Sequence, residues 1–232
     1  MVEIQKKITP YNFTALKNKR NEYIVIHYVG SVSTAKNNVD YFYNNKVSAS
    51  ASYFVDENSI WQCVEDKDAA WHCGGGLQGD KGHAYYLKCT NSNSIGIEMC
   101  VKKKPDGTWY FEKNTEQNTI DLIKYLMQKY NISINNVIRH FDVTGKNCPE
   151  PMLEDSVWLN FKNRILNEEK ETPKMIYNYI DKNMPEWARP TIQKLVDLGY
   201  LQGNEKNELN LDDTMLRLLV INDRAGLYDK KE

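Results

Sequence analysis

Short apolar runs separated by polar turns predict a set of β-strands in the first two thirds of the chain. Glycine and serine at positions 30 and 31 end the first of these runs, which is rich in β-branched and aromatic side chains. The polar stretch 56–59 joins the second and third runs and predicts a β-hairpin. The predicted strands lie at residues 23–29, 52–55, 60–64, 95–101 and 137–138.

Helical spacing of apolar residues appears in three segments of the same region. The first covers residues 36–44, the second runs from Thr115 to about Tyr130, and the third covers 152–168. The apolar faces consist of Ile120, Ile123, Leu126 and Met127 in the second helix, and of Leu153, Val157, Phe161 and Ile165 in the third. Strands alternate with helices, which predicts an α/β fold with a central mixed β-sheet flanked by helices.

The pattern changes after residue 168. Residues 169–184 are charged, contain a proline and are typical of a linker, so we expect a larger domain over 1–168 and a small helical module over 185–232. Trp187, Ile192, Leu195 and Val196 predict one amphipathic helix that ends at Gly199. Asp212 can cap a second helix, whose apolar residues are Met215, Leu216, Leu219 and Val220.

Charge and composition exclude several classes of protein. The 232 residues contain 30 Lys and Arg against 31 Asp and Glu, a net charge of −1 that argues against nucleic acid as a partner. Mean hydropathy is −0.65, and no apolar run approaches the roughly 20 residues of a membrane span. The polar first 20 residues lack the apolar core of a signal peptide, so we expect synthesis in the cytoplasm.

The cysteines and histidines carry the candidate chemistry. The five cysteines are an odd number and favour free or metal-bound thiols over a disulfide framework. His140 and Cys148 lie eight residues apart across a loop that contains Gly145, and imidazole and thiolate are both zinc ligands. His27, near the end of a predicted strand, is the best candidate for a third ligand, although a histidine there is more often a hydrogen-bonded structural residue. Three such ligands with an open fourth position are typical of catalytic zinc.

Five stretches, in this order, resemble the zinc-dependent N-acetylmuramoyl-L-alanine amidases of the amidase-2 type, which share a fold with peptidoglycan recognition proteins. They span about residues 20–165 and are IVIHYVG (24–30), SASYFVDENSIWQCV (50–64), AAWHCGGG (69–76), NSIGIEMC (93–100) and VIRHFDVTGKNCPEPM (137–152). The resemblance is nearest to phage endolysins and prophage amidases of Gram-positive bacteria. It implies that His27, His140 and Cys148 hold one Zn²⁺ per chain.

The resemblance also places Glu98 at the catalytic glutamate of the family. A carboxylate in the apolar run IGIEMC needs a partner or a function, because an isolated buried charge is costly, and its surroundings would raise its pKa as suits a general base. The alternative is a glutamate on the exposed face of an edge strand. Lys146 matches a lysine that polarises the scissile carbonyl or stabilises the oxyanion, and its alternative is a solvated loop lysine.

The remaining matches concern substrate binding. Trp71 and His72 belong to the W-H-x-G loop of the family, and the resemblance implies that the histidine contacts substrate at the rim of a cleft. A tyrosine that some members use before the hairpin strand is Ala51 here, and Tyr53 is its weak substitute because alternate strand residues share a face. Asp142 either orients a ligand imidazole or caps a turn.

The resemblance implies hydrolysis of the amide between N-acetylmuramic acid and L-alanine of peptidoglycan by a zinc-activated water, on the cell wall after release during phage lysis. Two alternatives remain open. One is a cysteine-type hydrolase that uses Cys148, His140 and Asp142. The other is a peptidoglycan-binding protein without activity. The module at 185–232 can serve wall binding, formation of a homodimer or stability of the chain.

Overall fold

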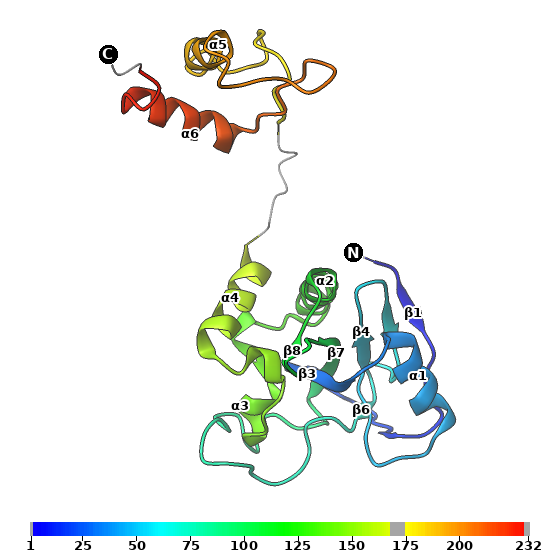
Figure 1. Ribbon diagram of the computed structural model, residues 1–232. Helices are drawn as coiled ribbons and strands as arrows, with labels where there is room; N and C mark the ends of the chain where they lie inside the picture. Colours follow the sequence, from blue (N-terminus) through cyan, green and yellow to red (C-terminus); the bar gives the residue numbers. More distant parts are fainter. Residues whose placement is uncertain (1, 168–174, 230–232) are drawn as a thin grey trace. The chain divides into compact units, whose positions relative to one another are not determined.

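A mixed β-sheet is the centre of the first of two units into which the chain divides, residues 1–168 and 169–232 (Figure 1). The computed structural model describes residues 2–167 and 175–229. Residues 169–174 of the linker predicted over 169–184 therefore lie outside the described residues.

Most neighbouring strands of this seven-stranded sheet run parallel. The strands are β1 (Ile4–Lys6), β3 (Tyr23–Val32), β4 (Tyr53–Val55), β5 (Ile60–Gln62), β7 (Ser94–Lys103), β8 (Trp109–Tyr110) and β9 (Val137–Arg139). Their order is β1-β5-β4-β7-β3-β9, and β8 pairs with β7. The predicted hairpin is confirmed, because β4 and β5 are antiparallel and Asp56 Oδ1 accepts hydrogen bonds from the turn amides of Asn58 and Ser59. A separate two-stranded sheet joins β2 (Phe13–Thr14) to β6 (Ala69–Ala70).

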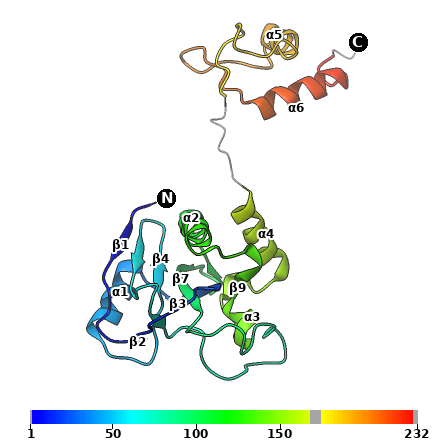
Figure 2. The same ribbon diagram turned by 180° about the vertical axis from the view of Figure 1, so that it is seen from behind.

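Two helices, α2 (Lys113–Tyr130) and α4 (Asp155–Leu166), cover one face of the large sheet (Figure 2). They also contact each other, so the main apolar core lies between this helix pair and the strands. Successive strand residues point to opposite faces, which is why every second residue belongs to this core. The core includes Ile24, Ile26, Tyr53, Val55, Ile95 and Ile97 from the sheet, and Ile120, Leu122, Ile123, Leu126, Trp158, Phe161 and Ile165 from the helices.

The opposite face of the sheet has a different cover. Helix α1 (Ala35–Asn44) packs over β4 and β5, and α3 (His140–Thr144) follows β9. The long loop 71–93 lies against α3, and the carbonyl oxygens of α3 accept hydrogen bonds from backbone amides of the loop. The three hydrogen bonds run from Gln78 N to Thr144 O (2.7 Å), from His83 N to Phe141 O (3.1 Å) and from Tyr85 N to Asp142 O (2.9 Å). The loop is therefore held in place without strands or helices of its own.

The helix predicted over 152–168 is shorter than expected. Short 3₁₀ turns occupy Ile134–Asn136 and Glu150–Met152, and α4 begins only at Asp155, so Leu153 precedes the helix. Val157, predicted on the apolar face, is 43% exposed, and Trp158 takes its place. The spacing along the helix explains this exchange. Positions 158, 161 and 165 lie three and four residues apart and share the face that packs on the sheet, whereas 157 lies outside this face.

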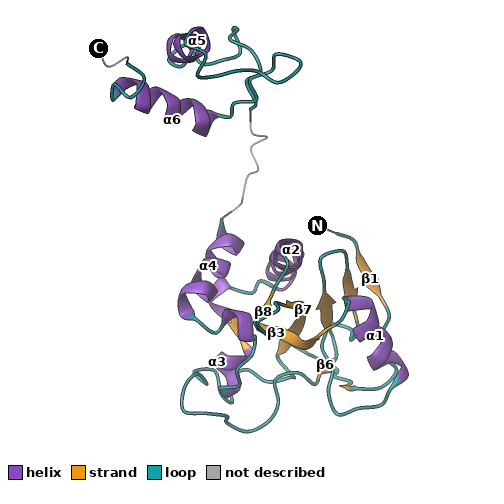
Figure 3. Ribbon diagram, in the orientation of Figure 1, coloured by secondary structure: helices purple, strands orange, loops and turns teal. Residues whose placement is uncertain are grey.

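Two helices and an extended segment make up the described part of the second unit. They are α5 (Arg189–Asp197) and α6 (Asp213–Arg224), drawn in purple in Figure 3. Asp212 caps α6 as predicted, because its Oδ1 accepts from Met215 N at 2.8 Å. Tyr177 and Met184, from the range predicted as a linker, are buried against Ile192 and Leu216, so residues 175–184 contribute to the core of this unit.

Helix α2 is amphipathic, with one face buried on the core and the other polar. Charged and amide side chains recur along α2, which has 18 residues and one buried face. Among the helices of the described ranges, none combines the length and the apolar character that a crossing of the bilayer requires.

Candidate active site

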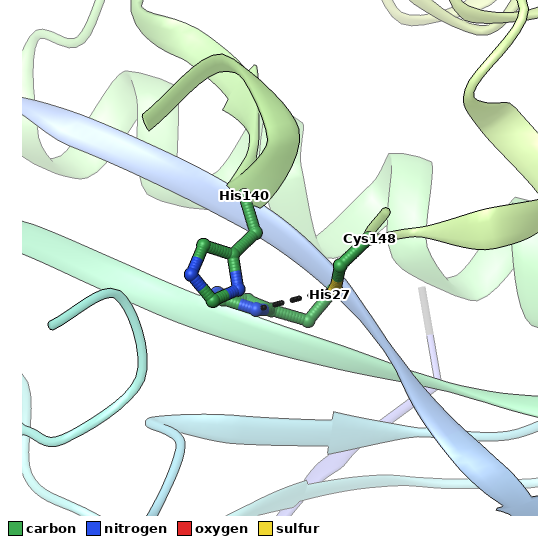
Figure 4. Close-up of side chains that lie close together, drawn as sticks. All are labelled: His27, His140 and Cys148. Carbon is green, nitrogen blue, oxygen red and sulfur yellow. Dashed lines mark hydrogen bonds between the residues drawn. The ribbon is translucent and has the colours of Figure 1, made fainter. Parts of the chain in front are cut away.

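Side chains from three separate segments meet on the sheet face opposite to α2. His27 lies on β3, His140 opens α3, and Cys148 lies in the loop that follows (Figure 4). All three are buried, and one potential ligand atom of each lies within 4.8 Å of the others. Sequence positions that are more than a hundred residues apart therefore form one group.

The strand register and one glycine explain why these side chains meet. Parallel pairing aligns Ile26 of β3 with Arg139 of β9, so the next residues, His27 and His140, are neighbours. The chain then returns at Gly145, whose φ is +79° and where a Cβ would lie 2.0 Å from Gln78 O. Phe141 N donates to Cys148 O at 2.8 Å, which holds the cysteine beside the helix start.

The donor set suits a divalent metal ion. Cys148 Sγ lies 3.7 Å from His27 Nδ1, close to the roughly 3.5 Å between nitrogen and sulfur ligands of tetrahedral zinc. Both ring nitrogens of His140 are buried and have no hydrogen-bond partner among the described residues. Burial lowers the pKa of His27 and lowers that of His140 to about 4, so both rings are neutral and offer lone pairs.

Glu98 lies next to this group because β3 and β7 are paired in register, with His27 opposite Glu98. Glu98 Oε1 is 4.0 Å from His27 Nδ1, and the side chain keeps 21% of its exposure. Its Oε2 atom is buried and accepts no hydrogen bond from the part of the chain that the structure describes. Removal from water raises the pKa of Glu98 to about 8, and the positive charge of Lys146 acts in the opposite direction.

Lys146 is an exposed residue in the loop between Gly145 and Cys148. Its positive charge acts to lower the pKa of both Glu98 and His140. It also lines a groove together with Gln78 and Asn147.

A second groove, of about 380 Å³, begins at Glu98 and extends along α1. Its lining is uncharged apart from Glu98 and combines amide and hydroxyl groups with aromatic and aliphatic side chains. They include Ser31, Asn37, Asn38, Tyr41 and Phe54. Such a surface suits an extended ligand with many amide and hydroxyl groups.

The structure does not bring the predicted substrate residues Tyr53 and Trp71 to this group. Tyr53 is 1% exposed on the α2 side of the sheet, where its hydroxyl donates to Asp66 Oδ1 at 2.7 Å. It does not share a face with Ala51, because β4 begins only at Tyr53 and Ala51 packs with Phe54 under α1. Trp71 Nε1 donates to Thr14 Oγ1 at 2.9 Å.

His72 lies close to the group but beneath it rather than at a rim. Only 9% of the side chain is exposed, and its Nδ1 is 3.0 Å from His27 Nε2. Its Nε2 is 3.1 Å from Ser94 Oγ, and its ring rests on Gly96. Sequence reasoning missed Ser94 and Gly96, although a glycine inside a buried strand is a signal of close approach by another group.

Asp142 does not orient a histidine. Its carboxylate accepts hydrogen bonds from the backbone amide and the guanidinium of Arg139 at 2.8 Å each, and it caps the start of α3. The thiol of Cys148 is buried, which raises its pKa to about 12 rather than lowering it. The triad of a cysteine-type hydrolase from Cys148, His140 and Asp142 is therefore not assembled.

Comparison with known families agrees with this geometry. The model of the family described as N-acetylmuramoyl-L-alanine amidase matches residues 17–151, which include the three converging side chains and Glu98. The chain belongs to this amidase family. The predicted α/β fold, with a mixed sheet flanked by helices and a helical C-terminal part, is confirmed by the structure and by its similarity to solved members.

Similar proteins come mainly from Bacillus. N-acetylmuramoyl-L-alanine amidase CwlL of Bacillus licheniformis is 34% identical over 71% of this chain and 47% of its own length. Amidase BlyA of Bacillus subtilis (strain 168) is 30% identical over 88% of this chain and 54% of its own. The chain thus spans about half the length of the curated relatives it matches.

Solved structures of an endolysin and of the PlyG catalytic domain are similar to this chain. A mutant endolysin from Bacillus subtilis is 30% identical, with a TM-score of 0.57 over 71% of this chain and 99% of that one. The PlyG catalytic domain is 31% identical, with a TM-score of 0.58 over 72% of this chain and 94% of that one. In both cases nearly the whole compared domain is matched.

The raised pKa of Glu98 predicts how the free energy of unfolding depends on pH in protein freed of metal by a chelator. Its pKa is about 8 in the folded chain, against 4.5 for an ordinary glutamate, so ionisation opposes folding as the pH rises through this window. Glu98→Gln removes that penalty. We expect the variant to be as stable as the parent near pH 4.5 and up to about 5 kcal/mol more stable above pH 8. Urea unfolding at a series of pH values measures the difference, and a pH-independent gap would contradict it.

Proposed function

We propose that the chain is a peptidoglycan hydrolase that cleaves the amide between N-acetylmuramic acid and L-alanine by means of a zinc-activated water. The observation that carries this proposal is the position of Glu98 beside the group of His27, His140 and Cys148. Membership in the amidase family supports the same reaction. The site of action would be the bacterial cell wall.

His27, His140 and Cys148 would hold the ion, one per chain, with neutral imidazoles and a sulfur that loses its proton on binding. Bound zinc supplies a lowered pKa for a water molecule and polarises a carbonyl oxygen. The unpartnered nitrogens of His140 support this assignment, because buried polar atoms without hydrogen bonds are rare unless a ligand satisfies them.

Glu98 would act as the general base and then as the acid. Its unpartnered, desolvated carboxylate accepts the proton of the attacking water, because a raised pKa brings proton affinity close to working pH. The same carboxylate then passes the proton to the leaving amine of L-alanine. Both proton transfers require a side chain within reach of the water oxygen and of the amide nitrogen. Glu98 lies at the edge of the groove where the amide would bind.

Lys146 would stabilise the negative charge that develops on the carbonyl oxygen. Its ammonium is exposed, yet its charge already acts on Glu98 and His140 across the site. The neutral groove along α1 would receive the substrate, since its amide and hydroxyl side chains match the hydrogen-bonding groups of a peptide or sugar.

We also propose that the second unit attaches the chain to the wall. Trp187, predicted within a helix, lies just before α5, is 40% exposed, and stacks on the Arg217 guanidinium at 5.4 Å. Together with Arg224 they line a groove of about 300 Å³ on α6. A groove lined by an aromatic ring and two guanidinium groups suits an anionic wall polymer that carries sugar rings, and attachment raises the local concentration of substrate.

Removal of zinc tests the reaction class. Dialysis against a chelator should abolish release of stem peptide from purified walls, and about one equivalent of zinc per chain should restore it. Mass spectrometry of the products should show a new amino terminus on L-alanine. Activity that survives the chelator but not alkylation of cysteine would identify the cysteine-type alternative, and binding to walls without release would identify the non-catalytic one.

Glu98→Gln tests the general base. Because the amide cannot accept the proton, turnover should fall by about 10² to 10⁴, while zinc content by elemental analysis should stay at the parental level. Glu65→Gln is the matched control, since Glu65 pairs with Lys6 of the edge strand β1 at 3.7 Å. Parental turnover of Glu98→Gln would refute the role of Glu98.

Trp187→Ala tests attachment by the second unit. Without the indole the groove loses its aromatic face, so we expect about tenfold weaker cosedimentation of the full chain with purified walls. Tyr200→Ala, another exposed aromatic of this unit outside the groove, should bind like the parent. Undiminished binding of Trp187→Ala, or a dimer that only this substitution dissociates, would contradict wall attachment through the groove.

A further inference from the structure

A row of hydrogen bonds leads from His27 into the interior of the first unit. His27 Nε2 lies 3.0 Å from His72 Nδ1, and His72 Nε2 lies 3.1 Å from Ser94 Oγ. Ser94 Oγ in turn donates to the carbonyl oxygen of Thr90 at 2.5 Å. His27, His72 and Ser94 are all buried, so water does not compete for these contacts.

The backbone carbonyl at the end of the row sets the direction of every hydrogen bond. A carbonyl oxygen can only accept, so the single hydrogen of the Ser94 hydroxyl is donated to Thr90 O. Ser94 Oγ can then only accept a hydrogen bond from His72 Nε2–H. The Cys73 thiol lies 3.6 Å from the same Ser94 oxygen but donates to Asn91 Oδ1 at 3.4 Å. These directions leave the proton of the His72 ring on Nε2.

The same reasoning reaches the candidate metal ligand. With the ring proton of His72 on Nε2, its Nδ1 is the acceptor that faces His27 Nε2 at 3.0 Å. It therefore accepts the Nε2–H of His27. A neutral His27 with its proton on Nε2 has a free lone pair on Nδ1, and this is the atom that lies 3.7 Å from Cys148 Sγ.

Gly96 provides an independent observation. A Cβ built on it would lie 2.5 Å from Cγ and 2.7 Å from Nδ1 of His72. Its φ is not in the left-handed region, so space rather than backbone conformation requires glycine here. Gly96 is the strand partner of Val25, two residues before His27, and the ring resting on it thus reaches His27 Nε2. Asn91 Oδ1 holds the amides of His72 and Cys73 at 3.1 and 2.9 Å and fixes the loop above.

We propose that His72 and Ser94 are positioning residues that hold His27 in the tautomer with a free Nδ1 and so prepare it for the metal. The inference rests on the metal centre of the proposed function and assigns a role to residues outside that centre. Groups that receive the second N–H of a ligand histidine typically change metal affinity by about 10- to 100-fold. His72 is thus a support for a ligand rather than a contact for substrate.

Zinc affinity of the full chain, measured by competition with a chromophoric chelator, is the first test. His72→Leu and Ser94→Ala should weaken binding by about 10- to 100-fold and by several-fold, respectively. His72→Asn should recover most of the loss, because its Oδ1 can replace Nδ1 as the acceptor. Thr90→Ala is the matched control, since Thr90 contributes only its backbone carbonyl to the row. Parental zinc affinity in both His72→Leu and Ser94→Ala would overturn the proposal.

The tautomer itself is the second test, and it needs neither metal nor activity. Long-range ¹H–¹⁵N spectra of the metal-free chain, which has four histidines, should show His27 protonated on Nε2. Ser94→Ala, a small change that leaves the His72 ring in place, should give a mixture of the two tautomers. A parental chain with His27 protonated on Nδ1 would refute the inference even if zinc and amidase activity were present. A chain that binds no zinc but shows the expected tautomers would instead refute the proposed metal centre.

Discussion

The parallel, in-register pairing of β3 with β7 is the constraint on which the rest of the structure depends. It aligns Ile24 with Ile95 and Ile26 with Ile97 on the face that α2 and α4 cover. The same alignment sets His27 beside Glu98 on the other face. A slip of one strand by one residue would turn its side chains over and place its polar group in the apolar core, so the burial of the isoleucines fixes the geometry of the site.

Burial gives this site its chemical character. Loss of water keeps the imidazoles neutral and raises the proton affinity of Glu98, whereas Lys146, at the surface, keeps its charge in contact with solvent. A group of neutral donors, one carboxylate and one nearby cation can bind a cation and still exchange protons near neutral pH. The scaffold achieves this because the polar residues occupy one face of strands whose other face is closed by helices.

Much of this fold could be predicted from sequence, because strands such as 95–101 and the helix ending at Tyr130 have clear periodicity. His27, His140 and Cys148 could be proposed from residue types and from resemblance, but their meeting depends on the pairing of Ile26 with Arg139, which no local pattern reveals. Tyr53 could not be placed, since alternation holds only inside a strand and β4 begins at that residue. The resemblance implied that His72 lies at the rim of a cleft, whereas Gly96 leaves room for its ring inside the unit.

The attachment of loop 71–93 to α3 has a consequence for how the molecule can be altered. Hydrogen bonds hold the loop to α3 and join its first residues to Asn91 near its other end. At Gly75 and Gly76, in contrast, no atom of the described chain lies within 4 Å of the position that a Cβ atom would take. Extra residues there would extend into solvent without pulling on the tied ends. This short stretch is therefore a natural place to graft a reporter peptide or an affinity tag near the catalytic face.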